Sequence, residues 1–137
     1  ASLQSVHRDV DDTLKPSAAD WIALQRAWSP GDQLTLTFDL PVRVLRMDGR
    51  VQSCRGKAAL ACGPVVYCLE SIDHPDLDLF DVRVKHKSLA AYFDPEILGG
   101  VRVIEGETVE GETVRFIPYH LWGNRGKSSM TVFFDIG

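Results

Sequence analysis

A chain of 137 residues is long enough for one domain, or for two very small ones, with a buried core. Apolar residues make up 45% of the chain and charged residues 25%, a composition typical of globular domains. The net charge of −4 and the dispersed basic residues argue against a nucleic-acid partner. No apolar run approaches the roughly 20 residues of a membrane span.

The first forty residues change from an unpatterned stretch to clear strand patterns. Residues 1–20 lack regular periodicity and are predicted to form an N-terminal arm or loop. Trp21 to Trp28 alternates and predicts a strand, and Ser29 to Asp32 has the proline and glycine of a turn. In Gln33 to Leu40, leucine and phenylalanine alternate with threonine and aspartate, which predicts a strand with one core face and one wet face.

A predicted hairpin follows. Val42 to Met47 reads as an extended segment, and Asp48-Gly49 is a strong two-residue hairpin signal. The chain is therefore expected to return as a strand through Arg50 to Cys54.

The segment from Gly56 to Glu70 has no polar side. Its two apolar runs, Ala58 to Cys62 and Val65 to Leu69, are hinged at Gly63-Pro64. A strand of a two-layer β protein normally alternates apolar and polar residues, so this segment needs cover on both faces. A domain this small does not readily supply such cover, and the segment is expected to contact a larger neighbour. The predicted interface residues are Ala59, Val66 and Cys68.

The second half of the chain predicts further short strands. His74 to Leu79 reads as a loop and Asp81 to Lys87 as a short strand, and residues 71–81 would be the place for a domain sub-boundary. Val101 to Ile104 and Thr113 to Tyr119 form a predicted hairpin, whose turn carries a tandem repeat, Glu-Gly-Glu-Thr-Val twice, read as an enlarged surface hairpin. Met130 to Asp135 is the closing strand. With seven or eight short strands and little helix, residues 21–137 are predicted to form an all-β, antiparallel sandwich domain.

The three cysteines are interpreted as thiols that do not form disulfides. Cys54, Cys62 and Cys68 are odd in number and lack a Cys-x-x-Cys pair, so neither a disulfide framework nor a zinc site is indicated. Buried thiols behave as small apolar groups, and their presence favours a reducing, cytoplasmic compartment. The scattered histidines likewise indicate no metal, and no cofactor is predicted.

No catalytic residue is assigned. Glycoside cleavage needs two carboxyl groups about 5 Å apart for retention, or about 6.5–9.5 Å apart for inversion. The sequence alone brings no such pair together, so Asp39, Glu70 and the acids between residues 73 and 81 are interpreted as solvated surface groups. The spacing of those acids matches no EF-hand loop.

The candidate binding residues lie near the C-terminus, in Tyr119, Trp122, Asn124 and Arg125. The two aromatic rings could stack on sugar rings, and the guanidinium offers a fork of donors to a carboxylate or to carbonyl groups. Two glycines and an asparagine in residues 123–126 fit a tight turn. The alternative reading of this motif is a structural clamp that joins two strands.

A set of motifs in fixed order carries a family resemblance. These are Arg-x-Trp-x-x-Gly-Asp at residues 26–32, Leu40-Pro-Val-Arg43, Gly56-Lys-Ala-Ala-Leu60, Cys62-Gly-Pro-Val-Val-Tyr-Cys-Leu-Glu70, Ile117-Pro-Tyr119, Trp122 and Asn124-Arg-Gly126. Together they resemble the C-terminal β region of the β-L-arabinofuranosidase family, glycoside hydrolase family 127. The resemblance implies a parent enzyme in which an (α/α)6 barrel holds the catalytic cysteine, the zinc-binding Cys/Glu cluster and the acid/base glutamate. Those roles are not transferred to Cys62 or Cys68.

The resemblance leads to one main hypothesis and two alternatives. The main hypothesis is a non-catalytic accessory β-sandwich that packs on the catalytic barrel of its parent and mediates oligomerisation, with a homodimer and a carbohydrate as further partners. The first alternative is a free-standing carbohydrate-binding module that uses Tyr119 and Trp122. The second is a small enzyme that depends on Glu70. Neither nucleic acid nor membrane is an expected partner.

Overall fold

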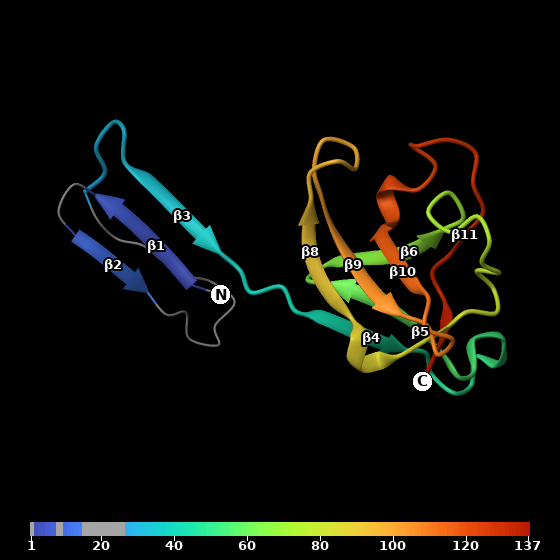
Figure 1. The fold of residues 1–137 in the computed structure, drawn as a ribbon. Helices are drawn as coiled ribbons and strands as arrows, with labels where there is room; N and C mark the ends of the chain where they lie inside the picture. Colours follow the sequence, from blue (N-terminus) through green and yellow to red (C-terminus); the bar gives the residue numbers. More distant parts are fainter. Residues whose placement is uncertain (1, 8–9, 15–26) are drawn as a thin grey trace. The chain divides into compact units, whose positions relative to one another are not determined.

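The computed structural model describes residues 2–7, 10–14 and 27–137 (Figure 1). Contacts within the chain divide it into two units, Ala1–Leu40 and Pro41–Gly137. The division therefore falls after Leu40, whereas the sequence pattern had suggested a change of character after residue 20. No described helix has the length and apolar character needed to cross a bilayer.

The first unit contains a three-stranded antiparallel sheet in the order β2-β1-β3. Its strands are β1 (Ser2–His7), β2 (Val10–Leu14) and β3 (Gln33–Thr37). β1 and β2 lie in the range expected to be an arm or loop, so that expectation is wrong for these residues. Neither strand has a clear alternation of apolar and polar residues. Both are strands because β1 pairs with β2 on one side and with β3 on the other.

The strand predicted from Gln33 is confirmed as far as Thr37, but its expected core face is not covered by the described residues. Leu34 and Phe38 on that face are both exposed. Most of the strand predicted from Trp21 to Trp28 lies outside the described residues, and its described end, Ala27 and Trp28, belongs to no strand.

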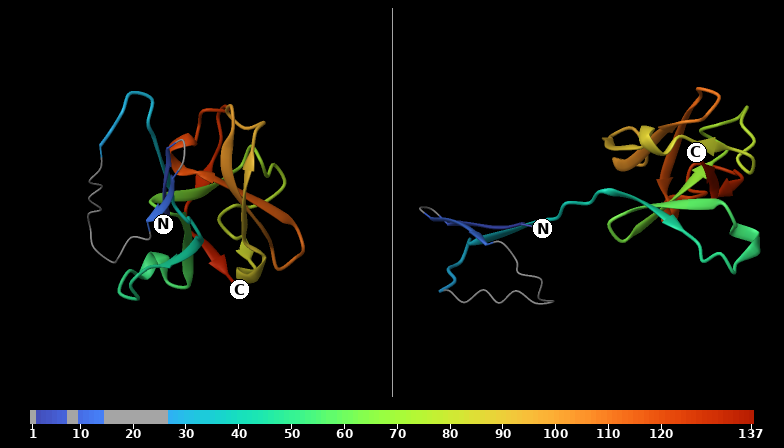
Figure 2. Two further views of the ribbon diagram at one scale, coloured as in Figure 1. Left: turned by 90° about the vertical axis from the view of Figure 1, so that its left-hand side faces the viewer. Right: turned by 90° about the horizontal axis from the view of Figure 1, so that it is seen from below.

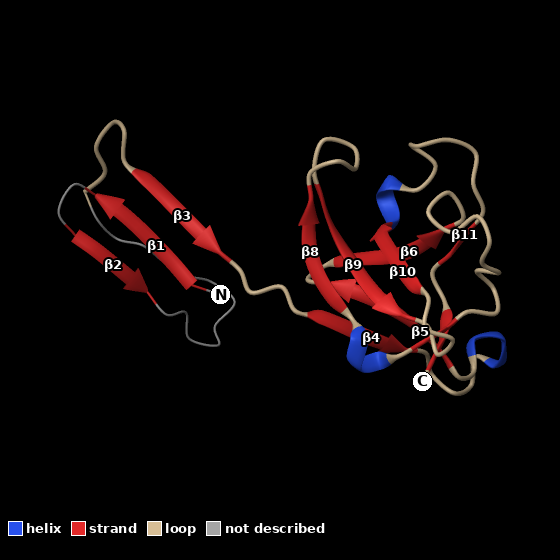
Figure 3. Cartoon of the chain, in the orientation of Figure 1, coloured by secondary structure: helices blue, strands red, loops and turns tan. Residues whose placement is uncertain are grey.

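The second unit is a curled sheet of nine strands with three single-turn helices in its loops (Figure 2, Figure 3). The order is β7-β12-β5-β6-β10-β9-β8, with β4 also paired to β5 and β11 to β6. All pairs are antiparallel except β7 with β12. The predicted all-β class with little helix is confirmed. The elements are β4 (Val42–Arg46), η1 (Gln52–Cys54), β5 (Lys57–Cys62), β6 (Val65–Glu70), β7 (Arg83–Val84), η2 (His86–Ser88), β8 (Ala90–Asp94), β9 (Val101–Glu107), β10 (Thr113–Pro118), η3 (Tyr119–Leu121), β11 (Met130–Thr131) and β12 (Phe134–Ile136).

The prediction of a hairpin at Asp48-Gly49 is correct for its first strand and wrong for its second. β4 is a strand, but it pairs with β5 and not with residues 50–54. Those residues form a turn and the short helix η1. Arg50 bonds back to Asp48 through its backbone and its guanidinium, which stabilises this compact turn in place of an extended return.

The two apolar runs around Gly63-Pro64 form β5 and β6, as predicted. Cys62 pairs with Val65, so Gly63 and Pro64 make a two-residue turn, and Gly63 takes the positive φ of 57° that a side chain would disfavour. Both strands are almost wholly buried. Consecutive residues of each strand are buried, so side chains on both faces are covered, which explains the missing polar side.

The segment from Gly56 to Glu70 is covered largely by the chain itself, which corrects the expectation that a larger neighbour covers it. Ala59 and Cys68, two of the predicted interface residues, are already buried within the chain. Cys68 packs in a cluster with residues of β9 and β10 and with Ile97 from the loop between β8 and β9. The curled sheet supplies cover that a flat sheet of this size could not. Of the three predicted interface residues, only Val66 remains exposed.

The tandem repeat places two identical pentapeptides in opposite environments. The first copy, residues 105–109, completes β9, and the second, residues 110–114, makes the turn and begins β10. Register pairs Val114 with Gly106, and both are buried. Val114 is 0% exposed, while the equivalent Val109 is 42% exposed. The repeat is therefore in a hairpin as predicted, but its second copy contributes to the core.

This pair provides a matched stability test. Val114→Ala removes two buried methyl groups and is expected to lower the free energy of unfolding by about 1.5–3 kcal/mol. Val109→Ala removes the same atoms from a largely exposed site and is expected to change it by less than about 0.5 kcal/mol. Urea unfolding followed by circular dichroism measures both. Equal effects would contradict the register of this hairpin.

The cysteines differ sharply in accessibility. The three, all in the described region, form no disulfide, and Cys62 and Cys68 are buried as predicted. Burial, followed by the nearby charge of Glu70, raises the pKa of Cys68 to about 12. Because only a thiolate attacks a disulfide reagent, we expect Cys54 to react with Ellman's reagent in the native protein. Cys62 and Cys68 should react only after denaturant is added. Rapid native titration of all three thiols would contradict this burial.

Candidate functional site

A buried ion-pair cluster joins the end of β6 to the loop after η3. We call it the Glu70 clamp, and it consists of Glu70, Asp73, Gly123, Arg125 and Ser128. The Glu70 side chain is fully buried, and its Oε1 accepts hydrogen bonds from Gly123 N at 2.9 Å and Ser128 Oγ at 2.6 Å. Its Oε2 accepts one from Arg125 Nη2 at 2.6 Å. Arg125 also makes a two-pronged contact with Asp73, at 2.8 Å through Nη1 and 2.5 Å through Nη2.

The electrostatics of the clamp favour the charged forms of Glu70 and Arg125. Burial alone would raise the pKa of Glu70, but hydrogen bonds from Ser128, Arg125 and Gly123, together with the Arg125 charge, lower it overall. Hydrogen bonds to Asp73 and Glu70 raise the pKa of Arg125 despite its burial. Glu70 is therefore not the solvated surface acid that the sequence suggested. Its oxygens are fully engaged in holding a loop.

The clamp accounts for the Gly-Asn-Arg-Gly motif as a structural element. Arg125 directs its guanidinium into the clamp, and Asn124 Nδ2 donates to the carbonyl of Leu121 at 3.2 Å. These contacts fix the loop that begins at Gly123, which has a positive φ of 77°. The reading of the motif as a clamp is thus the one that the geometry supports. The roles of Asn124 and Arg125 in substrate binding stay predictions without a shared site.

The aromatic candidates lie on the short helix that precedes this loop. β10 ends at Pro118, and η3 follows with Tyr119 as its first residue. Trp122 caps η3 and donates its backbone N–H to the Tyr119 carbonyl at 3.1 Å. Both rings are exposed. Of the four predicted substrate-binding residues, Tyr119 lines the groove described next, and the other three are not among its lining residues.

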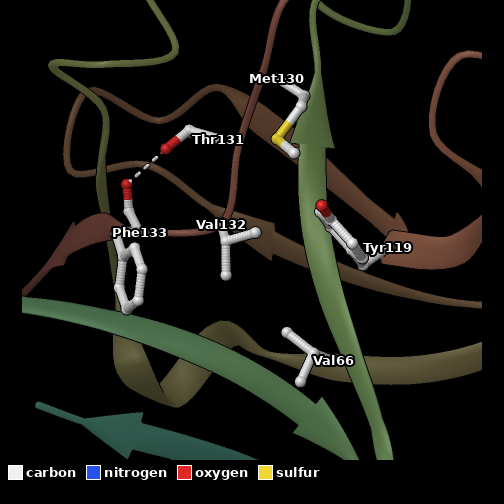
Figure 4. A pocket seen from close by; sticks show the side chains of 6 residues that line it. All are labelled: Val66, Tyr119, Met130, Thr131, Val132 and Phe133. Carbon is white, nitrogen blue, oxygen red and sulfur yellow. Dashed lines mark hydrogen bonds between the residues drawn. The ribbon is translucent and has the colours of Figure 1, made fainter.

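The pocket beside Tyr119 is an apolar groove of about 530 Å³ (Figure 4). We call it the Tyr119 groove. In Figure 4, Val132 lies between Phe133 on one side and Tyr119 on the other. The Thr131 hydroxyl donates to the Phe133 carbonyl at 2.8 Å and holds the bend between β11 and β12. The lining residues are Val66, Tyr119, Met130, Thr131, Val132 and Phe133.

The groove is backed by the core. Met130 and Val132 pack against the buried cluster that contains Cys68 and Ile117. β11 pairs with β6 next to the clamp, with Met130 opposite Glu70. The groove walls are thus attached to β6, a strand whose last four residues are buried. Such a surface is preformed and does not need to fold around a ligand.

The chemistry of the groove suits binding and not bond cleavage. None of its six lining residues is charged, whereas glycoside cleavage needs two carboxyl groups. Elsewhere among the described residues, no three His, Cys, Asp or Glu side chains are grouped so that they could hold a metal ion. A predicted interface residue, Val66, and a predicted sugar-binding residue, Tyr119, meet in this groove.

Sequence reasoning missed most of the groove. The sequence of Met130 to Asp135 predicts one continuous closing strand, but the structure has two short strands with a bend at Val132 and Phe133. That bend turns side chains of residues 130–133 toward Val66 and Tyr119. The sequence around the bend contains neither glycine nor proline, so no local signal marks it.

A family profile and a characterised protein both match this chain. Residues 42–135 match the profile of the glycoside hydrolase family 127 C-terminal domain. A non-reducing end β-L-arabinofuranosidase from Bifidobacterium longum subsp. longum is 31% identical, and the match covers 74% of this chain and 19% of that protein.

Two solved structures contain a region with the same fold as this chain. A family 127 β-L-arabinofuranosidase from Geobacillus stearothermophilus T6 superposes with a TM-score of 0.70 at 28% identity, over 100% of this chain and 25% of that one. A structure described as a glycoside hydrolase gives a TM-score of 0.75 at 27% identity, over 99% of this chain and 26% of that one.

The fold and these matches define a β-rich C-terminal domain of glycoside hydrolases. The chain belongs to glycoside hydrolase family 127, as the predicted resemblance indicated. It spans 19% of the length of the curated relative and about a quarter of the solved chains.

Proposed function

We propose that this chain is the C-terminal accessory region of a β-L-arabinofuranosidase-like glycoside hydrolase, and that it packs on the catalytic domain of the same polypeptide. The match to a C-terminal domain, over about a quarter of the solved relatives, supports this role. Catalysis then belongs to the remainder of the parent protein, and the present chain alone has no hydrolytic activity.

The observation that carries the proposal is the state of Glu70. A catalytic carboxyl group must reach the substrate, and as a general acid it needs a raised pKa. Glu70 is fully buried, engaged at both oxygens and shifted toward a lower pKa. These properties suit a structural group. Oligomerisation through this region stays a prediction, which sedimentation of the parent protein would check.

An activity assay tests the proposal. The purified 137-residue chain is expected to leave an aryl β-L-arabinofuranoside intact, with and without added zinc, while the full-length parent hydrolyses it. Turnover by the purified chain that is lost in Glu70→Gln would overturn the proposal. It would favour the small-enzyme alternative.

The exposure of Tyr119 and Trp122 favours a second candidate, a carbohydrate-binding module. Exposed aromatic faces three residues apart can offer apolar surface to sugar rings. Isothermal calorimetry with arabinose-containing oligosaccharides at millimolar concentration distinguishes the two functions. Heat that disappears in the Tyr119→Ala, Trp122→Ala double variant would favour the module, and absence of heat would remove it.

A further inference from the structure

We propose that the Tyr119 groove is the surface through which this region docks on its parent, and that it receives an apolar side chain from the catalytic domain of the same polypeptide. The inference rests on the proposed function and names the surface that carries it out. It follows from the lining of the groove, its rigid backing and the length of chain that the relatives carry beyond the matched region.

The lining selects an apolar occupant over a sugar. A sugar presents several hydroxyl groups, and each loses hydrogen bonds to water when it enters an apolar site. The groove has two hydroxyl groups, and that of Thr131 already donates to the Phe133 carbonyl. Tyr119 Oη has no hydrogen-bond partner within the described part of the chain, so it can bond to a carbonyl at the rim of an incoming domain. The other side-chain atoms of the lining residues are carbon and sulfur.

The size and backing of the groove suit a bulky side chain. A volume of about 530 Å³ leaves room for a bulky apolar side chain. Met130 and Val132 are held by the core, and the bend between β11 and β12 is closed by a hydrogen bond. Little ordering entropy is lost when such a surface is filled.

The small size of the groove favours a domain of the same polypeptide as its occupant over a second copy of the chain. A stable dimer commonly buries about 800 Å² per partner with about 20–30 residues a side, whereas six residues line this groove. Two domains of one polypeptide meet at high effective concentration, so a small apolar contact suffices. The matched region is 25% and 26% of two solved relatives, which leaves three quarters of such a chain to supply the partner.

Hydroxyl-radical footprinting of the full-length parent protein tests the inference. Tyr119 is 47% exposed here and Tyr92, on the edge strand β8, is 38% exposed. Without cover, Tyr119 should be oxidised at least as fast as Tyr92. We expect the reverse, with Tyr119 and Met130 oxidised several-fold more slowly than Tyr92, at all protein concentrations.

A pair of variants adds a control. Val66→Lys places a charge at the groove and should raise oxidation of Tyr119 to the level of Tyr92. Val51→Lys makes the same change at an equally exposed valine, 36% against 37%, and should leave Tyr119 protected. The wild-type footprint keeps the inference falsifiable if Val66→Lys fails to fold.

Each other outcome has a distinct meaning. Protection that disappears on dilution would identify a second copy as occupant, and protection relieved by arabinose-containing oligosaccharides would identify a sugar. Either would overturn the inference. Protection at Tyr92 and Phe93 with a reactive Tyr119 would also overturn it, but would leave the proposed packing intact. Full reactivity at all of these positions would overturn both.

Discussion

Arg125→Met is expected to lower the free energy of unfolding of the second unit by about 3–5 kcal/mol, because it leaves Glu70 buried without its cation. The matched control is Arg50→Met. Arg50 pairs with Asp48 at 2.8 Å, but its side chain is 90% exposed, so its loss should cost less than about 1 kcal/mol. Urea unfolding of the two variants measures the difference. Similar midpoints would contradict the role of the clamp.

The clamp also predicts how stability depends on pH. The pKa of Glu70 is lower in the folded protein than in the unfolded chain, so the unfolded state binds more protons and stability rises with pH. This contribution is present above the unfolded pKa of about 4.3 and is lost as the pH falls through the lower folded value. Glu70→Gln should therefore be less stable at neutral pH and should show a flatter acid limb. An acid limb as steep as that of the wild type would exclude Glu70 as its source.

Phe116→Ala is the second large effect, at about 3–5 kcal/mol. Phe116 in β10 is fully buried, and its ring lies 4.9 Å from that of Phe134 in β12. The contact joins two strands that are distant in the sheet order, so truncation leaves a cavity at the centre of the curl. A domain has a total stability of about 5–15 kcal/mol, so this loss approaches global unfolding.

Phe80→Ala is the control for the core substitution. Phe80 is 62% exposed, and its truncation should change the free energy of unfolding by less than about 0.5 kcal/mol. Thermal unfolding of both variants checks the expectation. If Phe116→Ala melted within a few degrees of Phe80→Ala, the aromatic contact would not be central to the core.

Local sequence patterns were sufficient to predict individual strands such as β5 and β6. The run from Ala58 to Leu69 has a hinge and two uninterrupted apolar stretches, and these become β5 and β6. What covers them depends on how the sheet curls, which involves contacts between β6, β9 and β10 across about 35–50 residues of chain. The pattern identified the need for cover but placed its source outside the chain.

The candidate site was predictable only in part for the same reason. Arg125 could be assigned to a carboxylate or carbonyl contact from its chemistry, but its partners lie 52 and 55 residues away. Glu70 ends a strand, a position that in sequence looks solvent-facing. The bend at Val132 and Phe133, which shapes the groove, is set by a hydrogen bond from Thr131 and carries no turn signature.

The clamp and the groove are mechanically linked through β6. Val66 lies near the start of this strand and Glu70 at its end, while the clamp fixes the loop that follows Tyr119. Loss of the clamp should therefore loosen the groove wall as well as destabilise the sheet. In the proposed parent enzyme, a clamp variant would weaken the support that this region gives to the catalytic domain.

Scanning calorimetry of the full-length parent carrying Arg125→Met tests the packing of this region on a catalytic domain most directly. If the two pack together, the variant should lower the unfolding temperature of the catalytic domain along with that of residues 41–137, and hydrolytic activity should be lost at a correspondingly lower temperature. Arg50→Met should move neither. A catalytic-domain transition and thermal inactivation unchanged from the wild type, with residues 41–137 melting separately at lower temperature, would contradict the packing.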